Sequence, residues 1–217
     1  MPEALDAARL ALVRVAAALG TRDADVVREA LAAAAGVADA TAVEEMILQS
    51  HLFVGFPDAL NALATWRDVS GTSAPPPLDE TAAEWETRGE RVCAAVYGRN
   101  YLKLRDNVRR LHPDFEGWMV AGGYGRVIGR PGLDLGTREL CIAALLAVWN
   151  VPRQLHSHLR GALNTGASVQ EVDQVVEVAC GMVSADTAAR VRALWGEIRG
   201  KAAAGAGGAD NGQDDRG

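Results

Sequence analysis

The chain has 217 residues, of which 49% are hydrophobic and 23% charged, and its formal net charge is −6. This length allows one domain or two small ones, and the acidic balance argues against nucleic acid as a partner, because phosphate binding needs a basic surface. Charged residues interrupt the apolar stretches before the roughly 20 residues that a bilayer span requires, and the first residues lack a signal-peptide pattern. We therefore expect a cytoplasmic protein that contacts neither nucleic acid nor membrane.

The cysteines Cys93, Cys141 and Cys180 lie far apart in the sequence. None belongs to a Cys-x-x-Cys pair or to a cluster of Cys and His with zinc-binding spacing. Each lies within an apolar helical pattern. We therefore expect three small buried side chains rather than a redox pair or a metal site.

Apolar residues recur at intervals of three and four along nearly the whole chain, which is typical of amphipathic helices. In chain order the pattern predicts helices over residues 5–19, 24–35, 41–54, 57–67, 82–97, 99–110, 114–121, 137–149, 152–164, 168–181 and 185–199. Glycine and proline mark the breaks, as at Gly55 with Pro57 and from Gly129 to Gly132. Alternating strand patterns are hard to find, so we predict an all-α fold.

Two segments differ in composition from the helical pattern. Residues 69–81 contain three consecutive prolines and predict an exposed linker. Residues 200–217 are rich in Gly, Ala and Asp, and they predict a disordered tail.

The helices on either side of the linker resemble each other. Arg28-Glu29-Ala30-Leu31 before the linker parallels Arg160-Gly161-Ala162-Leu163 after it. We interpret this similarity as a divergent duplication, with a degenerate first repeat over residues 1–68 and a second repeat over residues 82–199. Two such repeats are expected to pack about a pseudo-twofold axis.

The polar residues of the second repeat are concentrated in one short segment. Gln154 and His158 are four residues apart, so a helix places them on one face with Cβ atoms about 5–6 Å apart. His156 is turned by roughly 200° from His158 and faces nearly the opposite way. The unperturbed pKa of histidine lies near neutrality, so His158 suits proton transfer. Glu139, on the preceding predicted helix, suits orienting the imidazole or carrying a second proton.

Arginine and aromatic side chains nearby complete a candidate site. Arg130, Arg138 and Arg160 are candidates for holding a substrate carboxylate through paired contacts. Tyr124 and Trp118 are candidates for pocket walls. Each has a plainer alternative: Arg160 faces away from the histidine and suits an ion pair between subunits, Arg138 suits the surface, and the aromatic rings suit the core.

Structural roles also compete for the central residues. One alternative is that His158 forms a hydrogen bond to a backbone carbonyl. Others are that Glu139 is simply an acidic residue favoured by a helix N-terminus, and that Gln154 forms a structural hydrogen bond. A metal site formed by His112, His156, His158 and Glu139 is disfavoured, because nothing in their spacing brings them together.

Several blocks of sequence match a known pattern. The most specific is Gln154-Leu155-His156-Ser157-His158-Leu159-Arg160-Gly161-Ala162-Leu163-Asn164-Thr165-Gly166, and weaker matches are Gly89 to Gly98, Pro113-Asp114-Phe115 and Arg130-Pro131-Gly132-Leu133. With these blocks the chain resembles the carboxymuconolactone decarboxylase superfamily, which includes the alkyl hydroperoxidase D-like proteins. The resemblance implies an all-α, two-repeat carboxymuconolactone decarboxylase-like (AhpD-like) helical fold and a homotrimer or larger homo-oligomer.

The two branches of that superfamily differ at the site. The peroxidase branch carries a Glu, a Cys-x-x-Cys and a His; Glu139 and His158 stand at the Glu and His positions, but Val151 and Gln154 replace the two cysteines. Thiol chemistry is therefore excluded at this site. The decarboxylase branch lacks the cysteines and has the same His, but it typically has Glu where this chain has Gln154. An amide donates and accepts hydrogen bonds but does not transfer protons as a carboxylic acid does.

The resemblance implies a cofactor-independent decarboxylase, or a related lyase, that acts on a small lactone or unsaturated carboxylic acid. His158 is then the acid and base with Glu139 beside it, and the expected substrate contacts are Gln154, Arg130, Tyr124 and Trp118. We expect neither a metal nor a cofactor. The alternative is a noncatalytic member of the fold that binds a small molecule or a partner, and the amide at position 154 favours it.

Overall fold

The computed structural model describes residues 4–207, which form helices joined by turns and one longer irregular segment. In chain order the elements are α1 (Ala7–Thr21), α2 (Ala24–Ala34), α3 (Ala40–Ser70), α4 (Ala82–Tyr97), the 3-10 turn η1 (Gly98–Asn100), α5 (Tyr101–Leu111), α6 (Pro113–Gly117), the π-helix η2 (Trp118–Ile128), α7 (Leu135–Trp149), α8 (Pro152–Asn164), α9 (Val169–Cys180) and α10 (Ala185–Gly207). No strand occurs within residues 4–207. The all-α prediction is confirmed.

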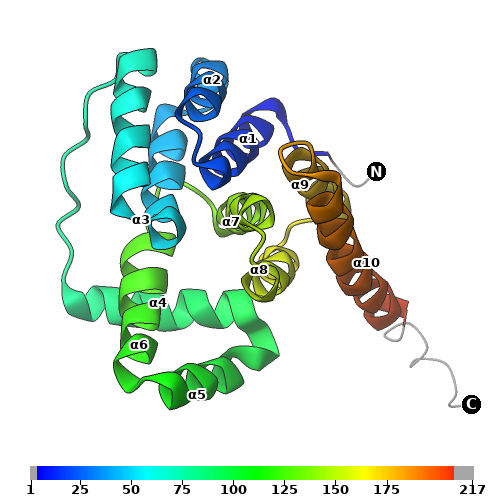
Figure 1. The fold of residues 1–217 in the computed structure, drawn as a ribbon. Coiled ribbons are helices and arrows are strands. Elements are labelled where there is room, and N and C mark those ends of the chain that lie inside the picture. The colour runs from blue at the N-terminus through cyan, green and yellow to red at the C-terminus, as the bar shows by residue number, and fades with distance from the viewer. Residues whose placement is uncertain (1–3, 208–217) are drawn as a thin grey trace, which may run out of the picture.

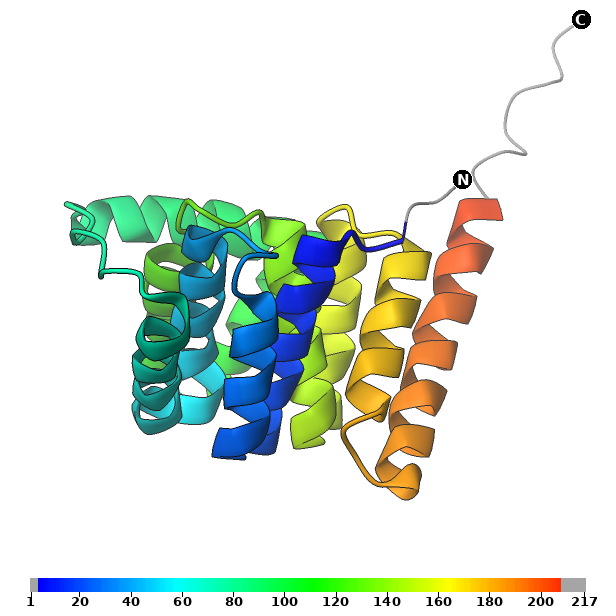
Figure 2. The same ribbon diagram turned by 90° about the horizontal axis from the view of Figure 1, so that it is seen from above.

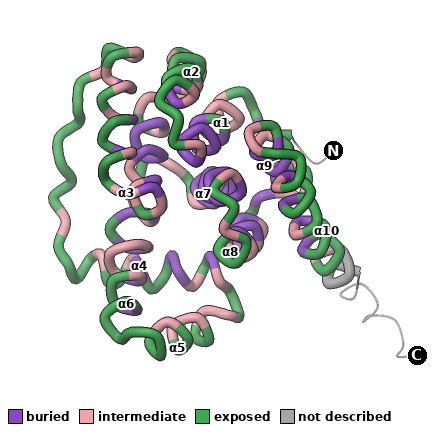
Figure 3. The backbone as a smooth tube through the Cα atoms, in the orientation of Figure 1, coloured by how far each residue is buried: buried purple, intermediate pink, exposed green. Residues whose placement is uncertain are grey.

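Helix α7 lies at the centre of the molecule and packs against α1, α3, α8 and α9 (Figure 1). Its N-terminus is capped by Asp134, whose side chain accepts a hydrogen bond from the Thr137 amide at 2.8 Å. Every residue from Gly136 to Ala147 is buried, as the tube of α7 shows (Figure 3). A helix that is buried on all sides needs neighbours all round, and the other helices supply them.

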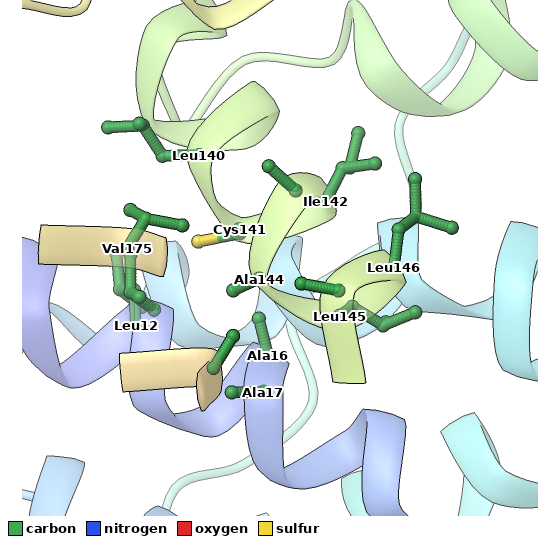
Figure 4. Close-up of a cluster of buried hydrophobic side chains, with 14 of the residues drawn as sticks. Leu12, Ala16, Ala17, Leu140, Cys141, Ile142, Ala144, Leu145, Leu146 and Val175 are labelled. Carbon is green, nitrogen blue, oxygen red and sulfur yellow. The ribbon is translucent and has the colours of Figure 1, made fainter. Parts of the chain in front are cut away.

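The core joins helices from both predicted repeats. Leu12, Ala16 and Ala17 of α1 lie beside α7 residues such as Cys141, and Val175 of α9 lies close by (Figure 4). Small side chains allow α1 and α7 to approach closely; a Cβ on Gly20 would lie only 2.8 Å from the carbonyl oxygen of Leu145. The two predicted repeats therefore share one continuous core.

All three cysteines are buried and free, as expected. Burial raises the pKa of the Cys93 and Cys141 thiols to about 12. Both thiols therefore stay protonated at neutral pH, which makes them poor nucleophiles.

Helix order repeats along the chain. The predicted duplication pairs α1, α2 and the two arms of α3, in that order, with α7, α8, α9 and α10. The arms of α3 meet at Gly55, where φ is +83°, so the break predicted between residues 54 and 57 is confirmed. Figure 2 shows many of the helices side by side with similar directions, and α4 lying across one end. This repeated order supports the duplication, which stays a prediction.

The segment after residue 121 departs from expectation. We predicted that the helix beginning at residue 114 ends at 121, but the π-helix η2 continues to Ile128. Three glycines in η2 obscure the helical pattern in the sequence, but Gly125 of η2 and Gly89 of α4 permit unusually close packing of the two helices. A Cβ on Gly125 would lie 1.9 Å from the Trp85 carbonyl oxygen, and one on Gly89 would lie 2.1 Å from that of Val120. Tertiary packing thus stabilises a helix where the local pattern predicts none.

The predicted linker and tail differ from the structure at their edges. Helix α3 continues to Ser70 and is capped by Gly71 at φ +67°, so the irregular, largely exposed segment begins later than the predicted residue 69. Residues 200–207 belong to α10, so the prediction of disorder is wrong there; Lys201 and the alanines after it favour helix. The rest of the predicted tail, residues 208–217, lies outside the described residues. Within the described chain, no helix is long and apolar enough to cross a membrane.

Candidate active site

His158 and Glu139 form a buried pair between α8 and α7. The Nδ1 atom of His158 lies 2.9 Å from Oε2 of Glu139, and the two residues are 6% and 0% exposed. Leu155, Leu159 and Ala162 share the buried face of α8 with the histidine. The carboxylate accepts a hydrogen bond from Nδ1, which fixes the ring orientation and leaves Nε2 as the nitrogen that can exchange a proton with a bound molecule.

Gly161 makes this contact possible. A Cβ at that position would lie 2.3 Å from Oε2 of Glu139 and 2.8 Å from a methyl carbon of Val96. Any larger residue would therefore displace the carboxylate from His158. The sequence signal for this contact is a glycine inside a helix, three residues after the histidine and so on the same face.

The bonding of Glu139 is incomplete. Its Oε1 atom is buried and has no hydrogen-bond partner in the described part of the protein. Buried polar atoms almost always have partners, and an unsatisfied one costs about 1–3 kcal/mol. Nε1 of the buried Trp66 is also without a partner within the described residues, so the unpaired oxygen does not by itself distinguish a functional from a structural role.

Two tyrosines lie within electrostatic reach of Glu139. The Tyr124 hydroxyl donates a hydrogen bond to the Tyr97 hydroxyl at 3.0 Å. Burial raises the pKa of Tyr97 to about 12 despite that hydrogen bond, and the charge of Glu139 acts in the same direction. Burial also holds the pKa of Tyr124 well above its ordinary value. Both phenols therefore keep their protons at neutral pH and remain hydrogen-bond donors.

Phe53 contributes to the site from the first predicted repeat. Its ring meets the His158 ring edge to face, with centroids 5.8 Å apart. The residue lies just before the break of α3 at Gly55. No local pattern singles out Phe53, because the contact joins segments about a hundred positions apart in the sequence.

A second buried ion cluster includes Arg138, the residue that precedes Glu139 in α7. Both carboxylate oxygens of Glu45 bind Arg130 at 2.9–3.0 Å, and one also binds Arg138 at 2.9 Å. Gln49 exchanges hydrogen bonds with the side chain and carbonyl of Arg138. The alternative that Arg138 lies at the surface is wrong, because its side chain is buried against α3. Glu45 neutralises the Arg130 guanidinium. This ion pair disfavours the predicted contact between Arg130 and a substrate carboxylate.

The other predicted residues lie in different surroundings. Gln154 is exposed and forms no hydrogen bond within the described residues. Trp118 is 65% exposed and packs on Phe115, with ring centroids 5.6 Å apart. His156 faces away from His158, as predicted, and lines a cleft on the other side of α8 together with Arg160. In residues 4–207 we find no group of three or more potential metal ligands.

Part of the all-α chain, including the buried pair, is similar to a known family. The profile of the Carboxymuconolactone decarboxylase family matches residues 113–197, a range that contains both members of the pair. "Peroxisomal protein 2" of Schizosaccharomyces pombe is 32% identical over 139 residues, which are 60% of this chain and 63% of that protein. "4-carboxymuconolactone decarboxylase" of Acinetobacter baylyi is 28% identical over 90 residues, which are 41% of this chain and 67% of that protein.

The match thus spans less than two thirds of the length of the Schizosaccharomyces protein. The profile match and the two relatives support the carboxymuconolactone decarboxylase and alkyl hydroperoxidase D-like superfamily.

Proposed function

We propose that the protein is a cofactor-independent decarboxylase, or a related lyase, that acts on a small lactone or unsaturated carboxylic acid. The observation that carries the proposal is the buried contact of 2.9 Å between His158 and Glu139. The similarity to a relative named as a decarboxylase supports the reaction class.

In the proposed reaction His158 supplies a proton. The bond between the substrate carbon and its carboxylate breaks, CO2 leaves, and the electron pair moves into a conjugated carbonyl to form an enolate. The imidazolium of His158 then protonates the carbon, and the neutral imidazole regains its proton from solvent. Atoms and charge balance without a cofactor.

Glu139 acts as a positioning residue through the imidazole. Its carboxylate holds the ring in one orientation and stabilises the imidazolium that donates the proton. The apolar surroundings strengthen this interaction because they exclude water. Gly161 keeps the space that the carboxylate occupies.

We also propose that the protein assembles as a homotrimer or a larger homo-oligomer. Large apolar side chains are exposed near the break of α3, among them Phe56 at 67% and Leu60 at 59%. Exposed apolar surface of this kind is a feature of subunit interfaces. Because Phe53 beside this surface touches His158, a neighbouring subunit would help to enclose the site. The proposed location is the cytoplasm; the competing location is the peroxisome, to which the name of the Schizosaccharomyces relative refers.

The test is an assay with γ-carboxymuconolactone that follows CO2 release and loss of the lactone. We expect turnover by the unaltered protein and a loss of at least about 100-fold in His158→Ala, because a lost general acid typically costs 10²–10⁴-fold. His112→Asn is the control, since this exposed histidine lies outside the pair and Asn retains a helix-capping side chain. Equal turnover in both variants would refute the proposal.

The alternative is a noncatalytic member of the fold that binds a small molecule or a partner. The exposed amide of Gln154, where the decarboxylase branch typically has a carboxylate, favours it. A ligand recovered with the purified protein, combined with no turnover of any lactone acid, would support this alternative.

A further inference from the structure

A cleft lies on the side of α8 that faces away from the His158–Glu139 pair. It has a volume of about 490 Å³ and is formed by the end of α4, η1, α8 and α10. An adjoining hollow of about 280 Å³ extends it along α5. The residues with polar side chains that line the cleft are Tyr97, Arg99, Asn100, His156, Arg160, Asn164 and Lys201. The space suits a small molecule.

The lining is positively charged. Arg99, Arg160 and Lys201 line the cleft, and Lys103 lines the adjoining hollow. No Asp or Glu of the described part of the chain lines either of them. This concentration of cations stands out in a chain that has 28 acidic and 22 basic residues. A concave surface lined by charges of one sign focuses the electric field and attracts ions of the opposite sign.

These four cations lack carboxylate partners. In the described residues none of Arg99, Lys103, Arg160 and Lys201 forms an ion pair. By contrast, Arg88, Arg105 and Arg130 elsewhere each bind a carboxylate. Within residues 4–207, no carboxylate competes with a ligand for the cations of the cleft.

Two of the cations act on the same point within the cleft. Burial lowers the pKa of His156, and the charges of Arg160 and Lys201 lower it further, while Glu197 opposes them. His156, Arg160 and Lys201 all line the same cleft, so the two cations lie around His156 rather than on separate surfaces. Guanidinium groups bind carboxylate and phosphate oxygens through two parallel hydrogen bonds.

The cleft also offers neutral contacts. The Asn164 side chain is fixed by donating a hydrogen bond to the Val96 carbonyl at 2.8 Å. Leu163 and Ile198 supply apolar surface. A ligand that matches this lining has anionic groups and a small carbon skeleton.

We propose that this cleft is a binding site for a small organic anion bearing carboxylate or phosphate groups, separate from the His158–Glu139 pair. Neither member of the pair lines the cleft, and His156 and His158 project to opposite sides of α8. The proposal therefore stands even if the protein is not a decarboxylase.

The test is isothermal titration calorimetry of the full chain with four probes: succinate, citrate, inorganic phosphate and pyrophosphate. We expect at least one probe to bind with one site per chain. Comparing succinate and citrate with phosphate and pyrophosphate shows whether the cleft binds carboxylates or phosphates. In an Arg160→Gln/Lys201→Gln double variant we expect the affinity to fall at least about tenfold, since two charge-assisted contacts are lost.

Arg153→Gln is the matched control, because Arg153 is an exposed arginine of the same helix that does not line the cleft. Affinity should be unchanged in this control. Two results would overturn the inference: no probe binds the folded protein, or Arg153→Gln weakens binding as much as the double variant does.

Discussion

Arg138 and Glu139 are neighbours in α7 and are both fully buried, yet their bonding differs completely. The Arg138 guanidinium donates to Glu45, to Gln49 and to three backbone carbonyls of the preceding turn. Glu139 has a single partner, His158, and one oxygen without any within the described residues. A saturated cluster stabilises a fold, whereas an unsaturated one retains capacity for a ligand or a proton.

The two clusters also connect different parts of the molecule. The Arg138 cluster joins α3 to α7 and holds the turn that contains Arg130. The His158–Glu139 pair joins only α7 to α8, which already pack through apolar side chains. We therefore expect mutations in the first cluster to affect mainly stability and mutations in the second to affect mainly activity.

The largest expected effect on stability is that of Arg138→Met. Removing the guanidinium leaves the Glu45 carboxylate with one partner fewer in a buried site, and breaking a buried pair in this way costs about 3–5 kcal/mol. Urea denaturation followed by circular dichroism measures the loss. A change below about 1 kcal/mol would show that the cluster is not structural.

A smaller loss of stability is expected for Gly161→Ala. The added Cβ meets Oε2 of Glu139 at 2.3 Å, so the carboxylate must move away from His158. Overpacking of this kind costs about 1–3 kcal/mol, and turnover should fall with it. Gly196→Ala in α10 is the control, because a Cβ there meets nothing within 4 Å, and helix propensity predicts a slight gain in stability. Equal stability of the two variants would contradict the close approach.

The smallest effect concerns a partly buried pair near the surface, Glu80 with Arg88. The hydrogen bonds from Arg88 lower the pKa of the Glu80 carboxyl from 4.5 to about 2. A carboxyl whose pKa is lower in the folded state contributes stability above pH 4.5, and this contribution is lost as the pH falls towards 2. The difference in unfolding free energy between the unaltered protein and Glu80→Gln should therefore shrink between pH 5 and pH 2. A constant difference over that range would show that the pair does not stabilise the fold.

The sequence predicts the helix positions and the approximate site, but it does not predict which distant residues contact the site. Glycine and proline mark breaks locally, so the break at Gly55 and the helices that carry Glu139 and His158 follow from the pattern. The Phe53 contact and the capture of Arg130 by Glu45 depend on packing between distant segments, which periodicity does not contain. The catalytic role of the pair stays a prediction.

The most direct test of that role is the rate of CO2 release from γ-carboxymuconolactone by Glu139→Gln, corrected for the folded fraction. The amide fills the same space and still accepts a hydrogen bond from His158, but it does not stabilise the imidazolium. We predict that the unfolding free energy stays within about 1 kcal/mol of the unaltered protein while the rate falls at least about 100-fold. An undiminished rate, or a large loss of stability without loss of rate, would contradict the assignment of this pair to chemistry.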